Sequence, residues 1–271
     1  MARANIQERT SGPWLLERAE RRTARADLGL GASTALVAGL VNVCGLIMFF
    51  AFSANVTGHA ATLAEELVKG HWYQAWVVLA WMGMFLLGAF LANLLVTRLA
   101  DRSVLLGHAG PVLLQVAVLA LVAHYGEHHY AETLWESELL IGGLLLSMGL
   151  QNGTAASVSN SVVRTTHLTG LFTDLAMELS QLLRASARAD AKLRFKFRLH
   201  ATILVAYLSG GLVGGLLCRW LEFRALYVGC GLLLGLVLRD LGVLWLARSR
   251  TRACAPAGGT QRDMTQGAEL G

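Results

Sequence analysis

Six long apolar runs constrain this chain more than any other feature of its sequence. Each run is close to, or longer than, the roughly 20 residues that a helix needs to cross the apolar core of a bilayer, and each carries almost no charge. A soluble fold built from six such runs would lack the polar surface to cover them. We therefore predict an all-α, polytopic membrane protein with six transmembrane helices. The runs span residues 31–56, 75–97, 104–126, 138–163, 200–218 and 225–247.

The distribution of charge agrees with this class and predicts an orientation. Only 15% of the 271 residues are charged, against about 25% in ordinary soluble domains. If the N-terminus is cytoplasmic, the inner segments carry 19 of the 23 Lys and Arg residues, as the positive-inside rule requires. This orientation explains the basic balance without any nucleic acid partner, and the bilayer itself is the partner that the runs imply.

The predicted organisation has five parts. The first 30 residues hold six arginines and no apolar signal-peptide core, so we expect a cytoplasmic tail there. The parts are an N-terminal tail (1–30), a first membrane repeat (31–126), an outer acidic loop (127–137), a second membrane repeat (138–247) and a cytoplasmic C-terminal tail (248–271).

An internal repeat relates the two membrane parts. The phrase "TGHAATLAEEL" at 57–67 returns as "TGLFTDLAMEL" at 169–179, and "GLVN" at 39–42 returns as "GLQN" at 149–152. The match continues from "LAWMGMFLLGAFL" (79–91) to "VAYLSGGLVGGLL" (205–217). Because each copy holds three spans, the second copy enters the membrane in the opposite direction. We therefore expect a 3+3 inverted-topology repeat, as in many secondary transporters.

The repeated asparagines mark the predicted site. At 1.5 Å per residue, Asn42 lies about 16 Å along its helix and Asn152 about 21 Å along its own, near the middle of a core about 30 Å thick. They could bind a polar solute or ion, or form an interhelical hydrogen bond worth about 0.6 kcal/mol. The predicted substrate-binding residues are Asn42, Gln151, Asn152, Thr154 and Ser157.

The Thr-Gly pairs are expected to turn the chain at opposite membrane faces. A glycine can end or bend a helix, and a threonine can cap the next one, so a short interfacial or re-entrant helix should follow the first and the fourth spans. These helices are either plain connectors or gates over a central site. The predicted turn and gating residues are Thr57, Gly58, Glu66, Thr169, Gly170 and Glu178.

Two charged residues lie inside the last apolar run. Arg239 and Asp240 are adjacent, so their side chains leave a helix about 100° apart and we do not expect a simple pair. Charged residues within a span are functional candidates. Either the helix ends near Leu238, with both residues at the inner interface, or they bond to other helices of the bundle.

The repeated phrases resemble a known family. The elements G-L-x-N, T-G-x4-L-A-x-E-L and above all "MGLQNG…TTHLTGLFTDL" are similar to the YoaK-like family of bacterial integral membrane proteins, a domain-of-unknown-function family. The resemblance covers about residues 31–247. It implies a multi-pass protein of the bacterial inner membrane, and the distribution of Lys and Arg predicts that both termini are cytoplasmic. The family commonly has an acidic residue at the position of Asn42 and an Asn at that of His59.

These observations favour a small-solute or ion transporter or channel with a polar site between the repeats. The alternative is a non-transporting membrane scaffold or sensor. No phosphate-binding loop, catalytic triad spacing or zincin motif is present, so we do not expect an enzyme, a cofactor or a metal. The solute and the coupling ion stay open, and so does a homo-oligomeric state.

Overall fold

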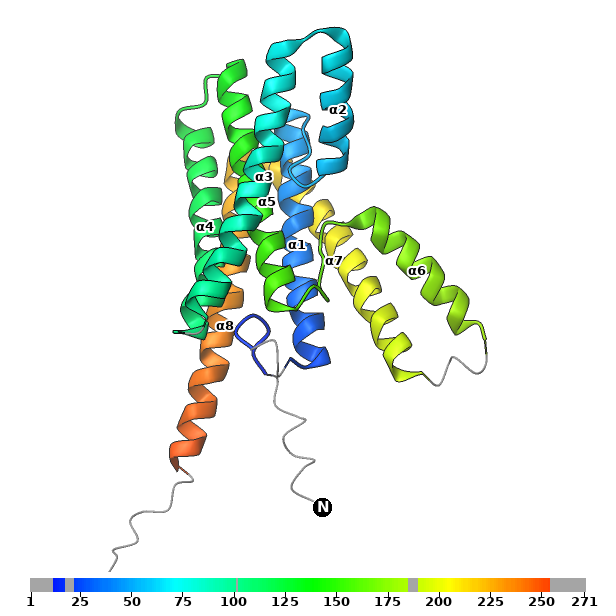
Figure 1. Cartoon of the computed structure of the whole chain (residues 1–271). Coiled ribbons are helices and arrows are strands. Elements are labelled where there is room, and N and C mark those ends of the chain that lie inside the picture. The colour runs from blue at the N-terminus through cyan, green and yellow to red at the C-terminus, as the bar shows by residue number, and fades with distance from the viewer. Residues whose placement is uncertain (1–11, 18–21, 101, 185–189, 254–271) are drawn as a thin grey trace, which may run out of the picture.

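The described chain is built from helices. The computed structural model describes residues 12–17, 22–100, 102–184 and 190–253 (Figure 1). The predicted all-α class is confirmed over these ranges. The elements are α1 (Ala24–Phe49), α2 (Val56–Lys69), α3 (Trp72–Leu99), α4 (Val104–His128), α5 (Leu134–Val158), α6 (Leu168–Leu182), α7 (Ala191–Leu221), a 3-10 helix η4 (Glu222–Arg224) and α8 (Ala225–Ala253).

Five helical segments of the described ranges are long and apolar enough to cross a membrane. The last of them includes both α7 and α8, which correspond to the fifth and sixth predicted runs. The chain therefore has the helices of a multi-pass membrane protein. The segments are Ala24–Phe49, Trp72–Leu99, Val104–His128, Leu134–Val158 and Ala191–Ala247.

The two short helices follow α1 and α5, where the sequence predicted them, and local signals define their ends. The Asn55 side chain accepts a hydrogen bond from the Gly58 N–H at 3.0 Å and caps α2. Gly70 ends α2 in the left-handed region, at φ 73°, where a glycine carries no steric cost. His167 directly precedes α6, but its side chain does not cap the helix. The first N–H groups of α6 therefore donate no hydrogen bond to this side chain.

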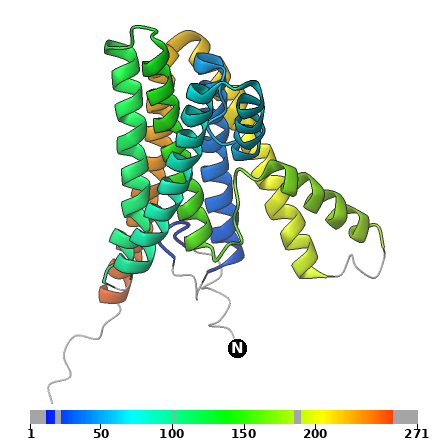
Figure 2. The same cartoon turned by 45° about the horizontal axis from the view of Figure 1, so that its top comes forward.

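The long helices form one bundle from which α6 and the adjoining part of α7 project (Figures 1 and 2). We call the end of the bundle where α1 begins the lower end, as in Figure 1. Helix α1 packs on α7, and α3 packs on α5. Helix α4 contacts α5 and α8. The short helix α2 packs on α3, and the short helix α6 packs on α7. Segments from the two halves of the chain are thus interleaved.

Glycines allow the closest approach in both major helix pairs. A Cβ at Gly39 of α1 would collide with the carbonyl of Tyr207 on α7. A Cβ at Gly149 of α5 would collide in the same way with the carbonyl of Phe85 on α3. Small residues let membrane helices pack backbone to backbone. Gly39 and Gly149 occupy the same position of the repeated G-L-x-N phrase.

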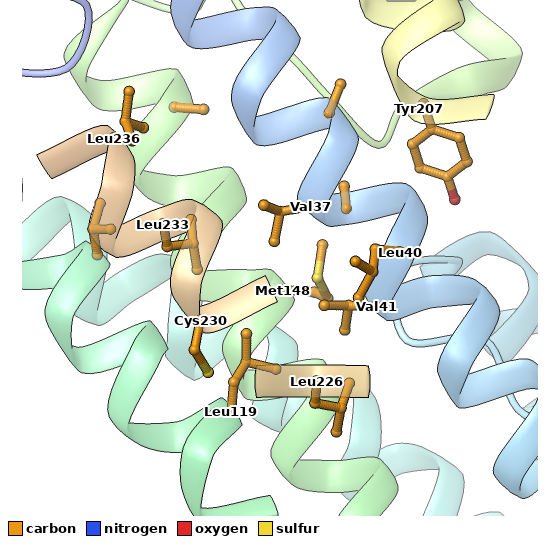
Figure 3. Packing of buried hydrophobic residues seen from close by; sticks show 14 of the residues in the cluster. Val37, Leu40, Val41, Leu119, Met148, Tyr207, Leu226, Cys230, Leu233 and Leu236 are labelled. Atoms are coloured by element: carbon orange, nitrogen blue, oxygen red, sulfur yellow. The ribbon is translucent and has the colours of Figure 1, made fainter. Parts of the chain in front are cut away.

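The packed core lies between α1, α4, α5 and α8 (Figure 3). Val41 of α1, Leu119 of α4 and Met148 of α5 are buried together with Leu233 of α8. Tyr207 of α7 lies at the edge of this cluster, apart from Leu233 (Figure 3). Since lipid tails are as apolar as these side chains, tight packing rather than water exclusion holds the helices together.

The helix boundaries differ from those of the apolar runs. Helix α1 begins at Ala24, and Leu15 and Leu16 before it are buried in the core. Helices α4 and α5 leave only residues 129–133 between them, because the Glu136 side chain accepts hydrogen bonds from Thr133 and caps α5 early. Helix α8 continues to Ala253, beyond the predicted end at 247. Residues 254–271 of the C-terminal tail lie outside the described residues.

Candidate functional site

A cavity of about 610 Å³, lined by both polar and apolar residues, lies between the two halves of the chain. The loops after α1 and α5 turn back along the helices that they leave, so α2 and α6 both begin beside the bundle (Figure 1). The first turns of both short helices line the same cavity. Its lining residues are Asn42, Phe52, Ala54, Asn55, Val56, Thr57, Phe85, Thr166, His167, Leu168, Thr169, Gly170 and Tyr207.

Asn42 is the predicted amide that reaches this cavity. Its Nδ2 donates to the Tyr207 hydroxyl of α7 at 2.8 Å. Its Oδ1 accepts from the Ala54 N–H at 3.0 Å and from the Ser53 hydroxyl at 3.4 Å. The side chain therefore fixes the returning loop after α1 and positions Tyr207. Asn42 therefore forms a hydrogen bond between α1 and α7, and it also lines the cavity.

Asn152 holds the matching loop but does not line the cavity. Its Oδ1 accepts from the Thr165 hydroxyl at 3.4 Å, as Asn42 accepts from Ser53 at 3.4 Å. Ser53 precedes Thr57 by the same four residues that separate Thr165 from Thr169. The Asn152 Nδ2 atom is buried and has no hydrogen-bond partner among the described residues.

The other three predicted binding residues link helices or bond within one. Gln151 Nε2 donates to the Thr34 carbonyl of α1 at 2.7 Å, and its Oε1 accepts from Gln115 of α4 at 2.8 Å. The Thr154 hydroxyl bonds to the Leu150 carbonyl of its own helix. The Ser157 hydroxyl donates to Asn93 of α3 at 2.9 Å. None of the three is in the cavity lining.

The Thr-Gly pairs lie elsewhere than predicted. Thr57 of the first pair and both Thr169 and Gly170 of the second line one cavity, although we expected the pairs at opposite membrane faces. The reason is the backward course of the two loops, which no local signal in the sequence indicated. Gly58 is not in the cavity lining, and its N–H donates to the Asn55 side chain that caps α2.

The repeated glutamates bind histidines at the far ends of the short helices. Glu66 of α2 contacts His71 Nδ1 at 2.8 Å. Glu178 of α6 contacts His200 Nδ1 of α7 at 3.1 Å. Both contacts tie a short helix to the long helix that follows it. Glu66 and Glu178 are therefore anchors of α2 and α6, and neither lines the central cavity.

Sequence reasoning missed four polar residues of the cavity, Asn55, Thr166, His167 and Tyr207. Tyr207 was paired with Trp81 in the repeat without a role, while Asn55 and His167 precede the repeated phrase and were not singled out. The signal that could have identified Asn55 and His167 is their place directly before a predicted short helix. Tyr207 lies 165 residues from Asn42 in the chain, and no sequence pattern connects the two.

The electrostatic character of the cavity comes from helix ends and neutral dipoles. Its described lining includes no Asp, Glu, Lys or Arg. The N-terminus of a helix carries a partial positive charge and unpaired N–H groups, and two such ends meet here. A second cavity of about 270 Å³ shares His167 and Gly170 with the first and adds Arg164, Asp174 and His200. The two cavities therefore adjoin at the start of α6.

Arg239 and Asp240 bind the N-terminal segment rather than another long helix. Asp240 is fully buried and accepts from the Leu15 and Leu16 N–H groups at 2.6 and 3.0 Å. Arg239 lies 3.5 Å from the centre of the Trp14 ring. It also contacts Asp240 at 2.7 Å, which corrects our expectation that the two residues form no simple pair. Helix α8 does not end near Leu238.

The apolar spans and the interleaved bundle define the class, a multi-pass α-helical membrane protein with a cavity between its two halves. The chain belongs to the family described as "Protein of unknown function (DUF1275)", whose sequence profile matches residues 30–239. This match confirms the resemblance inferred from the repeated phrases. Comparison with curated proteins gave no match, and comparison with solved structures gave none.

Proposed function

We propose that this protein transports a small solute or ion across the bacterial inner membrane, without enzymatic chemistry. In this proposal α7 and α8 are separate spans, so the six spanning helices form two inverted repeats. An even number of spans puts both termini on the same side of the membrane, which the charge distribution assigns to the cytoplasm. One observation carries the proposal: a cavity of about 610 Å³ lined by the first turns of α2 and α6 together with Asn42. Transporters built from inverted repeats bind substrate at the interface of the repeats, near broken helices.

Matched contacts in the two halves support the inverted repeat. The loops are held by Asn42 with Ser53 and by Asn152 with Thr165. The helix pairs α1–α7 and α3–α5 exchange equivalent elements between the halves. Such a swap is expected when one copy enters the membrane in the opposite direction and the two copies intertwine.

The test is flux through purified protein in proteoliposomes. Thr169 lines the cavity in the first turn of α6, and Thr173 lies one turn further along the same helix, outside the lining. We expect Thr169→Trp to fill the cavity and to lower flux at least about tenfold, a change of about 1.4 kcal/mol. Thr173→Trp should keep the wild-type rate. Equal rates in the two variants would contradict the proposed route.

The alternative function, a membrane scaffold or sensor, has one observation in its favour. Gln151 donates to Thr34 of α1 and accepts from Gln115 of α4, so this buried amide links three helices and serves their packing. A scaffold predicts no flux of any solute by the wild-type protein. It also predicts that Thr169→Trp leaves every measured property of the protein unchanged.

A further inference from the structure

We propose that a projecting arm of the molecule, formed by α6 and residues 191–200 of α7, binds an anionic phospholipid of the cytoplasmic leaflet. The lipid phosphate would lie against Arg194 and Arg198, and the acyl chains would lie along the exposed apolar face of α7. The arm leaves the bundle toward its lower end (Figures 1 and 2). The inference goes beyond transport, because it holds for a scaffold as well.

An exposed apolar stripe runs along α7 and ends at these two arginines. Its residues follow one another at three or four positions, so they share one face of the helix, and each is more than half exposed. Arg198 lies two turns before the first stripe residue on that face, and Arg194 lies one turn before Arg198. In a membrane-spanning bundle such a face contacts acyl chains. The stripe residues are Val205, Leu208, Leu212 and Leu216.

The length of this face matches the thickness of a bilayer. At 1.5 Å per residue, Arg198 lies about 27 Å from Leu216 along α7, and Arg194 lies about 33 Å from it. The hydrocarbon core is about 30 Å thick. A stripe that reaches one interface at Leu216 therefore places both guanidinium groups at the headgroups of the opposite leaflet. With a cytoplasmic N-terminus, that leaflet is the inner one.

The side chains at the start of α7 favour an anionic headgroup. Arg194 and Arg198 are exposed, and their side chains form no hydrogen bond or ion pair with another described residue. A guanidinium can donate two parallel hydrogen bonds to a phosphate. Lys192 and Lys196 are also exposed. A cluster of four basic residues beside a spanning helix is typical of binding to anionic lipid.

The carboxylates of the arm do not neutralise this cluster. Asp190 caps α7 by accepting from the Lys192 and Leu193 N–H groups, and Glu178 contacts His200. Asp174 lines the second cavity. None of these three acids forms an ion pair with a basic side chain of residues 192–198, so the positive charge there is available to a headgroup.

Helix α6 adds a second apolar surface to the arm. Phe172, Leu179 and Leu183, which directly follows the helix, are each more than half exposed. They are seven and four positions apart and therefore share one face. Leu171 and Glu178 are buried on a different face, where α6 packs on α7. An amphipathic helix of this kind is stable at the boundary between headgroups and acyl chains.

The corresponding part of the first half has no such cluster. Lys69, at the end of α2, pairs with Glu65 at 2.6 Å, and residues 70–97 that follow carry no Lys or Arg. The upper end of the bundle therefore lacks the positive charge that the arm presents, and the proposed binding is specific to one leaflet.

Native mass spectrometry of the delipidated protein in detergent tests the proposal. The probes are phosphatidylglycerol, which is anionic, and phosphatidylcholine with the same acyl chains, which carries no net charge. Glycerol 3-phosphate supplies the phosphate without acyl chains. We expect phosphatidylglycerol to bind at least about tenfold more tightly than phosphatidylcholine, and we expect no binding of glycerol 3-phosphate.

Two matched double variants locate the site. Arg194→Gln with Arg198→Gln removes both guanidinium groups from exposed positions, and glutamine favours a helix about as well as arginine, so the variant should fold. We expect its affinity for phosphatidylglycerol to fall about tenfold or more, with no change for phosphatidylcholine. Arg98→Gln with Arg102→Gln removes the same charge from exposed positions at the end of α3 and should keep the wild-type affinities.

The outcomes bear on the lipid site alone, since none of them measures transport. Loss of the preference for phosphatidylglycerol in the variant of residues 194 and 198 only would support the site. Equal affinity of the wild type for the two lipids, or equal losses in the two double variants, would overturn it. Binding of glycerol 3-phosphate as tight as that of phosphatidylglycerol would assign a free phosphate instead. A dimer that only the variant of residues 194 and 198 abolishes would assign a second copy of the chain instead of lipid.

Discussion

Equivalent residues of the two halves have different partners, and Asn42 and Asn152 show why. The ring that faces Asn42 is Tyr207, whose hydroxyl accepts from the Asn42 amide. The repeat places Trp81 at the position of Tyr207, and an indole has a donor but no acceptor. Its Nε1 donates to the Glu138 carbonyl at 2.9 Å instead. The Asn152 Nδ2 therefore has no partner among the described residues, and the site is asymmetric.

Asp240 should be the most sensitive single carboxylate for stability. It is fully buried and accepts two backbone N–H groups and Arg239. Asp240→Ala leaves these donors and the Arg239 charge without their acceptor, so we expect a loss of about 3 kcal/mol in the free energy of unfolding. Denaturant unfolding in detergent measures this change.

Asp174→Ala is the matched control, because Asp174 is only partly buried and its side chain forms no hydrogen bond with another described residue. Its effect should stay within about 0.5 kcal/mol. Similar losses in the two variants would show that the contacts of Asp240 with residues 15 and 16 do not stabilise the fold.

At the scale of elements, the interfaces of α1 with α7 and of α3 with α5 depend on glycine. Gly39, Gly210 and Gly214 bring the backbones of α1 and α7 together, and Gly88 and Gly149 do the same for α3 and α5. These glycines lie in the repeated phrases. The repeat relates residues 205–217 to residues 79–91, but it did not identify α1 as the helix on which residues 205–217 pack.

Gly39→Ala should destabilise the α1–α7 interface. The added methyl group would collide with the backbone of Tyr207 and Gly211, and such overpacking costs about 1–3 kcal/mol. The shift should also loosen the contact of Asn42 with Tyr207. The thermal midpoint in detergent measures the destabilisation.

Gly231→Ala is the control for this change. Gly231 lies inside α8, and a Cβ there would meet no atom within 4 Å. Because alanine favours the helix by about 1 kcal/mol over glycine, this variant should be at least as stable as the wild type. A midpoint for Gly39→Ala equal to that of Gly231→Ala would argue against close packing of α1 on α7.

At the scale of the whole molecule, the short helices lead in opposite directions from one cavity. The far end of α2 lies at the upper end of the bundle, and the far end of α6 lies toward the lower end (Figure 1). With a cytoplasmic N-terminus, Lys69 at the end of α2 would face the outside. Arg184, just beyond α6, would then face the cytoplasm.

Cysteine labelling of intact cells tests this topology. Lys69→Cys should react with a membrane-impermeant maleimide in intact cells, whereas Arg184→Cys should react only after the membrane is permeabilised. Both positions are exposed. The unmodified chain serves as the blank for the native cysteines, of which Cys44, Cys218 and Cys230 are buried. Labelling of both variants from the same side would contradict the inverted repeat.

The sequence by itself determined the features that depend on composition, local order and repetition. Uninterrupted apolar runs have to be helical in a bilayer, since every backbone group must bond within its own segment. The repeated Thr-Gly phrases correctly predicted a short helix after each of two spans, α2 after α1 and α6 after α5. Asn42 was a candidate site residue because the repeated G-L-x-N phrase places it near the middle of its span, and the structure places it in the cavity lining.

Only the tertiary structure decided how these parts meet. The backward course of the two loops depends on Asn42 and Asn152, which bond to residues further along the chain, and on a Tyr207 contact across 165 residues. Contacts of that separation leave no periodic signal in a single sequence. They bring two helix N-termini to one cavity, and they assign Gln151 and Thr154 to packing, because polar groups away from water bond to whatever partner the fold brings near.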